Sequence, residues 1–269
     1  MKIGFIGGGN MAEAMIGGML KQGFAARDIS VVDPGADRRT YLATQFGVAV
    51  EAAASATLAV DVLVLAVKPQ ILREVLAGLP RLAADTCVLS IAAGVRAGDI
   101  ARWLSGHDAV VRAMPNTPAL VGAGIAGLFA LPGASAPQRA HAEQVLKAVG
   151  QVVWVADEAQ IDAVTAISGS GPAYVFLFIE ALEAAARELG LNAETARALA
   201  VQTVYGAAAL AVLDGSEPAL LRARVTSKGG TTERGIAALE EHGVRAAVSA
   251  AARAAAARAG ELGDLLGAE

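Results

Sequence analysis

Six short runs of apolar, mostly β-branched residues divide the first part of the chain. They read KIGFIG, ISVVD, GVAV, VLVLAV, CVLSIAAG and AVVRAM, and segments of helical character separate them. Strands that are apolar on both faces and alternate with helices are typical of a parallel sheet that helices cover on each side. The pattern predicts a doubly wound α/β domain of the Rossmann type over residues 1–156.

The character of the chain changes near Asp157, where strand-like runs give way to helices. Apolar residues now recur at three- and four-residue spacing, so we expect an all-α domain over residues 157–269. Its alanine-rich helices carry more apolar surface than a small bundle needs, which favours a helical dimer interface; a compact monomeric bundle is the alternative. The expected helices cover residues 158–168, 172–190, 193–215, 218–225 and 244–266.

Composition and charge exclude several classes of partner. The chain has 269 residues, 55% of them hydrophobic, which is enough for two buried cores. Its formal net charge of −4 gives no general attraction to nucleic acid or to an anionic membrane, so we expect neither partner. The longest apolar stretch, Pro172–Ala186, contains Glu180 and Glu183 and is shorter than the ~20 residues that span a bilayer. We expect it to form a buried helix.

Cysteine and histidine are rare, which narrows the chemistry further. Cys87 is the one cysteine, so the chain has no intrachain disulfide and suits a reducing, cytoplasmic compartment. Its apolar surroundings favour an inert buried thiol over a reactive one. His107, His141 and His242 are scattered and lie beside no Cys or carboxylate at ligand spacing, so we expect no metal site.

A glycine-rich turn, GFIGGGNMA, follows the first expected strand and opens a helix. Gly7, Gly9 and Ala12 fit the pattern G-x-G-x-x-G/A, in which glycines let the backbone approach a pyrophosphate and the helix start faces the phosphates. Asp33 ends the second strand, where an acid can accept the ribose hydroxyls of the adenosine. This context favours a dinucleotide site over a tight turn without a ligand.

The residues around Asp33 leave the choice of cofactor open. A carboxylate at this position favours NADH, because it repels a 2′-phosphate. Arg38 and Arg39 follow a few residues later and could instead bind that phosphate.

Two further segments lie at the carboxyl ends of expected strands. In AVKPQ, residues 66–70, Pro69 directs the chain out of the sheet and leaves Lys68 either at the cofactor edge or simply in solvent. In RAMPNTPALVGAG, two prolines flank Asn116 and Thr117. Such a rigid polar segment can form a wall for a nicotinamide and its substrate, or can be a plain loop.

Glycines and hydroxyl groups precede an expected helix in VTSKGGTTERGIAAL, and that helix begins near Thr231 or Thr232. A helix start offers unpaired N–H groups and the positive end of the dipole to a carboxylate or phosphate. A threonine N-cap after a glycine turn is the alternative, but it does not explain the whole cluster. SGSGPAYVF, with Pro172 near the first turn, has the same form and could be only a helix junction.

Together these motifs resemble one enzyme family. GFIGGGNMAEAMIGG, AVKPQ, MPNTPALVGAG, DEAQIDAVTAISGSGPAY and VTSKGGTTERGIAAL, in this order and spacing, look like pyrroline-5-carboxylate reductase, which catalyses the last step of proline biosynthesis. The similarity covers nearly the whole chain. It implies reduction of (S)-1-pyrroline-5-carboxylate to L-proline with NADPH or NADH. It also implies an active site at the interface of a homodimer or of a decamer built as a pentamer of dimers.

The resemblance also assigns residues to the site. The implied cofactor-binding residues are Gly7, Gly8, Gly9, Asn10, Met11, Asp33, Ala66, Val67, Lys68 and Pro69. The implied substrate-binding residues are Glu158, Ser227, Gly230, Thr231 and Thr232. Thr232 is our candidate catalytic residue, because hydride addition to an imine needs a donor beside the nitrogen as charge develops. The amides of residues 230–232 would bind the substrate carboxylate.

Two positions depart from the family's habit. Lys228 stands where the family usually has proline, and Ala53 stands where it often has an asparagine thought to meet the adenosine ribose. Two other functions remain alternatives. One is a related reductase of hydroxyacids or other cyclic imines, and the other is a dinucleotide-binding regulatory protein without catalysis.

Overall fold

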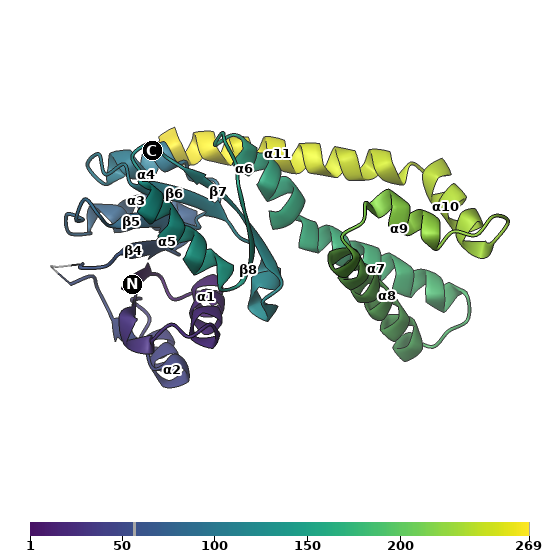
Figure 1. Cartoon of the computed structure of the whole chain (residues 1–269), viewed down its shortest axis with the longest axis horizontal. Coiled ribbons are helices and arrows are strands. Elements are labelled where there is room, and N and C mark those ends of the chain that lie inside the picture. Colours follow the sequence, from purple (N-terminus) through teal and green to yellow (C-terminus); the bar gives the residue numbers. More distant parts are fainter. Residues whose placement is uncertain (56–57, 269) are drawn as a thin grey trace. The chain divides into compact units, whose positions relative to one another are not determined.

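The computed structural model describes residues 1–55 and 58–268. Contacts between residues divide the chain into two units, drawn in Figure 1. The sheet unit comprises Met1–Ser170 together with the chain from Arg253 onward, and the helical unit comprises Gly171–Ala252. This division differs from the predicted boundary after Ala156. Residues beyond that boundary pack on the sheet: Ile161 of α6, for example, is 1% exposed and α6 contacts two strands.

One mixed sheet forms the centre of the sheet unit, with strand order β3-β2-β1-β4-β5-β6-β7-β8. All neighbouring strands are parallel except β6 and β7, which are antiparallel. The order reverses between β1 and β4, so this edge is the topological switch point of a doubly wound fold. The strands are β1 Ile3–Ile6, β2 Ile29–Val32, β3 Ala49–Glu51, β4 Val62–Leu65, β5 Cys87–Ser90, β6 Val110–Met114, β7 Gly124–Ala130 and β8 Gly150–Trp154.

The first six strands confirm the six predicted runs, whereas β7 and β8 were not predicted. β7 contains Gly124 and Gly127, and glycine weakens a strand signal. Gly127 is required by close packing, because a Cβ at this position would lie 2.7 Å from the Val164 side chain of α6. The glycine that this packing needs therefore made the strand hard to predict from the sequence.

Helices cover both faces of the sheet (Figure 1). On one face α1 and α5 bury Met15, Ile16 and Val145 against Phe5 of β1. On the other face α3 and α4 bury Leu72 and Ile100 against the strands. The helices of this unit are α1 Asn10–Lys21, α2 Ala36–Phe46, α3 Pro69–Ala77, α4 Ala97–Trp103, α5 Ala136–Lys147 and α6 Gln160–Val164, with short 3-10 turns η1 Ala26–Asp28 and η2 Thr117–Val121 and the π-helix η3 Thr165–Gly169.

The single cysteine lies within this core. Cys87 on β5 is fully buried, and burial raises the pKa of its thiol to about 12. A thiol that stays protonated at neutral pH is a poor nucleophile, so the expectation of an inert buried cysteine is confirmed.

The helical unit has a different character, because α7 and α8 pack as a pair but leave large apolar side chains exposed. Phe176 is 60% exposed and Tyr205 is 67% exposed. The prediction that residues 172–186 form a buried helix is therefore wrong for the single chain. The helices here are α7 Gly171–Glu188, α8 Ala193–Asp214, α9 Pro218–Arg224 and α10 Thr231–Glu241, and α11 Val244–Ala268 continues into the sheet unit.

Candidate active site

The glycine-rich turn between β1 and α1 has the conformation that its sequence predicts. Gly7 has φ +95°, and its N–H donates to the Val32 carbonyl at 2.8 Å. A Cβ at this position would lie 2.7 Å from the Ala66 carbonyl oxygen. Only glycine meets both conditions without strain. The turn therefore brings the backbone close to the start of the predicted AVKPQ segment.

The start of α1 is open to a ligand. Gly9 is its N-cap, Gly9 and Asn10 are exposed, and no side chain of the described residues caps the helix. A Cβ on Gly9 would meet nothing within 4 Å. Unpaired N–H groups at the positive end of a helix dipole suit a pyrophosphate, so the residues here fit the predicted dinucleotide.

The Asp33 carboxylate connects two loops of this edge. It accepts a hydrogen bond from the Gly8 N–H and another from the Gly35 N–H, each at 2.8 Å. Arg39 donates to the Asp33 carbonyl at 2.7 Å. Asp33 thus fixes the glycine turn against the start of α2, in addition to the ribose contact that the sequence predicts.

Arg38 lies against the glycine turn and belongs to a polar cluster that the sequence did not predict. Its guanidinium donates to the carbonyls of Gly8 and Gly9 and pairs with Glu13 at 2.6 Å. Tyr41 donates to the other Glu13 oxygen at 2.7 Å, and the guanidinium carbon lies 5.0 Å from its ring centre. Burial raises the pKa of Glu13, but hydrogen bonds from Tyr41 and Arg38 outweigh it, so the pKa is lowered.

The AVKPQ segment lies beside the glycine turn at the carboxyl edge of the sheet. The Ala66 N–H donates to the Ile6 carbonyl at 2.8 Å, which aligns the ends of β4 and β1. Val67 is half-buried, while Lys68 is the exposed N-cap of α3 and Pro69 occupies the first helical position. The ten predicted cofactor residues therefore lie on three neighbouring segments of one edge.

Asn116, in the loop after β6, is 8% exposed and uses its amide as a bridge. Its Oδ1 accepts from the Ile125 N–H at 3.0 Å, and its Nδ2 donates to the Ser168 carbonyl at 3.1 Å. Four residues after Ser168 stands Pro172, which has no N–H to satisfy that carbonyl. Asn116 replaces the missing helical hydrogen bond.

The SGSG stretch is not a free helix start. It spans the end of the π-helix η3 and the start of α7, and the Ser170 N–H donates to the Thr165 carbonyl five residues earlier at 2.8 Å. The helix uses the Ser170 N–H and Asn116 uses the Ser168 carbonyl, so the stretch joins α6 to α7 without an opening for a ligand. Of the two predicted helix starts after residue 157, the one before α10 remains.

The start of α10 resembles the start of α1. The helix begins at Thr231, as predicted, with Gly230 as N-cap and no side-chain cap among the described residues. The Gly230 N–H donates to the Ser227 carbonyl at 3.0 Å. Glu233 reaches back to the Gly229 N–H at 2.6 Å, which fixes the turn. The side chains of Ser227, Thr231 and Thr232 are exposed.

Glu158 is the one predicted substrate residue that lies in the sheet unit. Its Oε1 accepts from the Ala97 N–H at 2.7 Å and from Arg112 at 3.1 Å. Arg112 also faces Asp162 at 3.5 Å. Sequence reasoning missed Arg112, although an arginine within the apolar run AVVRAM was a signal for a buried ion pair.

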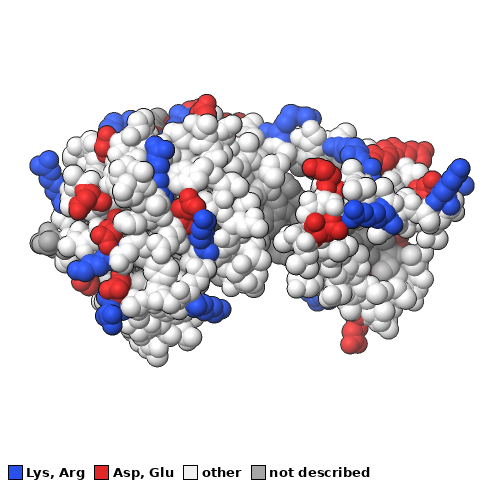
Figure 2. Space-filling view, viewed as in Figure 1, with Lys and Arg blue, Asp and Glu red and all other residues white. Residues whose placement is uncertain are grey.

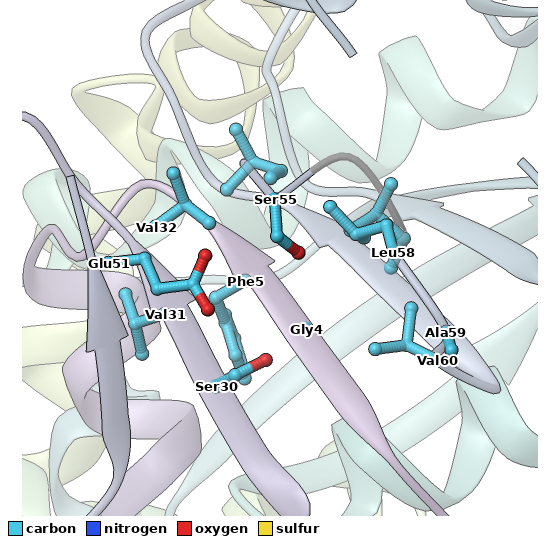
Figure 3. A pocket seen from close by; sticks show the side chains of 12 residues that line it. Gly4, Phe5, Ser30, Val31, Val32, Glu51, Ser55, Leu58, Ala59 and Val60 are labelled. Atoms are coloured by element: carbon cyan, nitrogen blue, oxygen red, sulfur yellow. The ribbon is translucent and has the colours of Figure 1, made fainter. Parts of the chain in front are cut away.

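A cavity of about 220 Å³ opens on one face of the sheet and reaches the carboxyl ends of β1, β2 and β3 (Figure 3). Phe5, Ser30 and Glu51 line it from three strands, and Leu58 and Val60 line it from the connection to β4. None of its lining residues is among the predicted site residues. Positive and negative side chains are interspersed on the visible surface in Figure 2.

Comparisons with known proteins identify the family. The family model described as pyrroline-5-carboxylate reductase dimerisation matches residues 158–262. A curated pyrroline-5-carboxylate reductase of Pseudomonas aeruginosa is 48% identical over 268 residues, which cover 99% of this chain and 98% of the relative. The chain belongs to the pyrroline-5-carboxylate reductase family. A relative from Synechocystis is 44% identical, with 98% of each chain covered.

Solved structures of pyrroline-5-carboxylate reductases share the fold. The Coxiella burnetii enzyme matches with a TM-score of 0.91 and 42% identity, covering 97% of this chain and 98% of that one. The Plasmodium falciparum enzyme, solved with NADP bound, matches with a TM-score of 0.83 and 28% identity, covering 98% of each. A model described as NADP oxidoreductase coenzyme F420-dependent matches residues 2–94, which contain the glycine turn.

The exposed apolar side chains of α7 and α8 lie on two long helical stretches. Gln160–Glu188 and Ala193–Asp214 are long and apolar enough to cross a membrane by length and composition alone. The dimerisation model of the pyrroline-5-carboxylate reductase family covers both stretches. Exposed apolar helices in such a domain are typical of an interface between subunits. The domain therefore supports oligomer formation.

Proposed function

We propose that this protein reduces (S)-1-pyrroline-5-carboxylate to L-proline by hydride transfer from NADPH or NADH. One observation carries the proposal: α10 begins with an uncapped, exposed SKGGTT turn in a chain that belongs to this family over its full length. Neither alternative function explains that turn. A hydroxyacid reductase would need an acid or base beside its alcohol, and a regulatory protein would need no second anion site.

The cofactor site is proposed at the carboxyl edge of the sheet unit. The amides at the start of α1 would bind the pyrophosphate, with residues Gly7 to Met11 on one side and Ala66 to Pro69 on the other. Asp33 would approach the adenosine ribose through the turn that it fixes. When bound, the nicotinamide supplies the hydride. The NADP bound to the Plasmodium falciparum relative supports this part of the proposal.

The substrate site is proposed at the start of α10. The amides of residues 230–232 would bind the carboxylate, and Ser227 would line the turn. The Thr232 hydroxyl would donate to the imine nitrogen while the carbon of the C=N bond accepts the hydride. The nitrogen would take one proton in this step, through the hydroxyl and from solvent, and the secondary amine so formed would take a second proton from water to give the ammonium form of proline. Binding and orientation supply most of the rate, because no strong base is needed.

We also propose a homodimer in which a second copy covers the apolar side chains of α7 and α8, and five dimers form a decamer. The exposure of these side chains in the single chain supports the dimer. The pentameric arrangement rests on the family resemblance. The single buried thiol is in keeping with a cytoplasmic location.

Steady-state kinetics test the proposed function. The purified protein is mixed with pyrroline-5-carboxylate and either cofactor, and loss of the reduced nicotinamide is followed together with formation of proline. We expect turnover, with equal amounts of cofactor oxidised and proline formed. Tight cofactor binding without turnover would instead support the regulatory protein, and oxidation of an alcohol substrate would support the hydroxyacid reductase.

A further inference from the structure

Arg112 is a buried cation at the centre of a charged group in the sheet unit. It lies on β6 between Ser90 of β5 and Phe129 of β7, and its side chain is 5% exposed. Its guanidinium pairs with Glu158 at 3.1 Å and faces Asp162 at 3.5 Å. A buried guanidinium is costly unless carboxylates pair with it, so these two carboxylates compensate Arg112.

The Glu158 carboxylate also completes the start of a helix distant in sequence. The N-cap of α4 is Arg96, whose side chain has no acceptor atom, and no side-chain cap is present there. The first helical N–H, that of Ala97, donates to Glu158 Oε1 at 2.7 Å. Glu158 therefore supplies the acceptor that Arg96 lacks, and its negative charge lies at the positive end of the helix.

This contact fixes a loop at the proposed cofactor edge. Residues 91–96 connect β5 to α4, and the Ile91 N–H donates to the Leu65 carbonyl at 3.1 Å, directly before Ala66. The loop is thus held at one end beside the proposed cofactor segment and at the other end by Glu158. Arg96 also pairs with Asp264 of α11 at 2.5 Å, which holds the loop from its exposed side.

We propose that Glu158 and Arg112 are positioning residues for hydride transfer and that Glu158 is not a substrate ligand. This inference rests on the proposed function. Arg112 orients the Glu158 carboxylate, the carboxylate holds Ala97, and the loop of residues 91–96 keeps its place at the carboxyl edge. One oxygen of Glu158 already accepts two hydrogen bonds, and its charge is compensated by Arg112. Little of that charge remains for an iminium group.

Kinetics of Glu158→Ala separate a positioning residue from a ligand. The variant keeps the substrate site of the helical unit but loses the contact to Ala97. We expect kcat to fall by about 10- to 100-fold, the scale of a misplaced reacting group, while the substrate KM and the NADPH Kd change by less than about 3-fold. The isotope effect with 4-deuterated NADPH should rise, because hydride transfer becomes slower relative to product release.

Two further variants serve as rescue and control. Glu158→Gln keeps an oxygen that can accept from Ala97, so we expect it to recover most of the kcat lost in Glu158→Ala. Asp162→Asn keeps an oxygen for the longer contact to Arg112 and removes only the charge, so kcat should change by less than about 3-fold. Arg112→Lys loses the fork that orients Glu158 and should lower kcat in the same way as Glu158→Ala.

Three outcomes decide the inference. A substrate KM raised at least about 10-fold with unchanged kcat would make Glu158 a substrate ligand and overturn the proposal. If Glu158→Gln lost as much kcat as Glu158→Ala at a normal melting temperature, the proposal would also be overturned. The site would then need the charge of Glu158 and not only its hydrogen-bond acceptor. Absence of turnover in the wild-type protein would refute the proposed function itself, and is distinct from both. If Glu158→Ala does not fold, the comparison of Glu158→Gln with Arg112→Lys decides.

Discussion

The helices α1 and α10 both begin at a glycine without a side-chain cap, yet their surroundings differ. The start of α1 is supported on several sides: Asp33 holds the Gly8 amide, Arg38 contacts two carbonyls of the turn, and Met15 and Ile16 bury the helix in the core. The start of α10 has only local support, from Ser227 and Glu233. The first anion site is built into a folded unit.

The second anion site belongs to a unit whose core is incomplete in a single chain. In α7, α9 and α10 no residue is buried, and in α8 only Ala196 and Ala200 are. Hydrophobic burial is the main stabilising term of a fold, so helices this exposed need a partner. The cofactor site should therefore survive in a monomer, whereas the substrate site should depend on assembly.

The largest expected effect is on assembly. Phe176→Asp places a charge on the exposed apolar side of α7 and should remove about 1.5–3 kcal/mol of burial per subunit, and so weaken the dimer by about 10²- to 10⁴-fold. Analytical ultracentrifugation measures this, and activity should fall with it while NADPH still binds. Ala140→Asp, at an exposed position of α5 in the sheet unit, is the matched control. An unchanged dimer in Phe176→Asp would show that the exposed apolar side of α7 does not form the interface between subunits.

Gly7→Ala tests the support of the first site. The φ of +95° costs an alanine about 1–2 kcal/mol, and the contact with the Ala66 carbonyl adds to it. We expect cofactor affinity to fall by about 100-fold and the melting temperature to drop. Gly9→Ala meets no atom of the chain, so it should keep the melting temperature and weaken only cofactor binding. Equal melting temperatures for both variants would argue against the packed turn.

Arg38→Gln tests cofactor choice at the same edge. The guanidinium lies on the glycine turn, where it can attract a 2′-phosphate, although Glu13 compensates part of its charge. We expect the ratio of kcat/KM for NADPH to that for NADH to fall by about 10-fold. Glu13→Gln should change the ratio in the opposite direction. An unaffected ratio in both variants would leave the preference to other groups.

The smallest expected effect is at Lys228, where the family usually has proline. The side chain is exposed, and no hydrogen bond of its N–H is found among the described residues. Lys228→Pro should therefore stabilise the turn by about 0.4–1 kcal/mol, through the unfolded chain, and leave kcat almost unchanged. Chemical denaturation of the dimer measures it. A destabilised variant would show that the turn has adapted to lysine.

The sequence predicted the parts of the fold that depend on local pattern. The strand runs, the glycine turn and the start of α10 at Thr231 follow from periodicity and turn chemistry, and all are present. β7 was not predicted, because the glycine that makes room for α6, Gly127, is unusual in a strand. The sequence left the SGSG stretch open between a ligand site and a helix junction, because the five-residue hydrogen bonds of a π-helix are not visible in composition.

The site was predictable where one segment supplies its own geometry. The pairing of Glu158 with Ala97 joins residues 61 positions apart, and the bond from Asn116 to Ser168 joins residues 52 apart. No local signal carries such contacts, because they exist only after the sheet has formed. For the same reason the sequence did not predict the cluster of Glu13, Arg38 and Tyr41.

Thr232→Ala tests most directly that the start of α1 binds the cofactor and the start of α10 binds the substrate. We expect a loss of about 1–3 kcal/mol of transition-state stabilisation, the scale of one hydrogen bond to a charged group, and thus a kcat lower by about 5- to 150-fold. The dissociation constant of NADPH, measured without substrate, should stay the same. Wild-type turnover in this variant, or weaker NADPH binding with unchanged turnover, would show that Thr232 does not donate to the imine nitrogen.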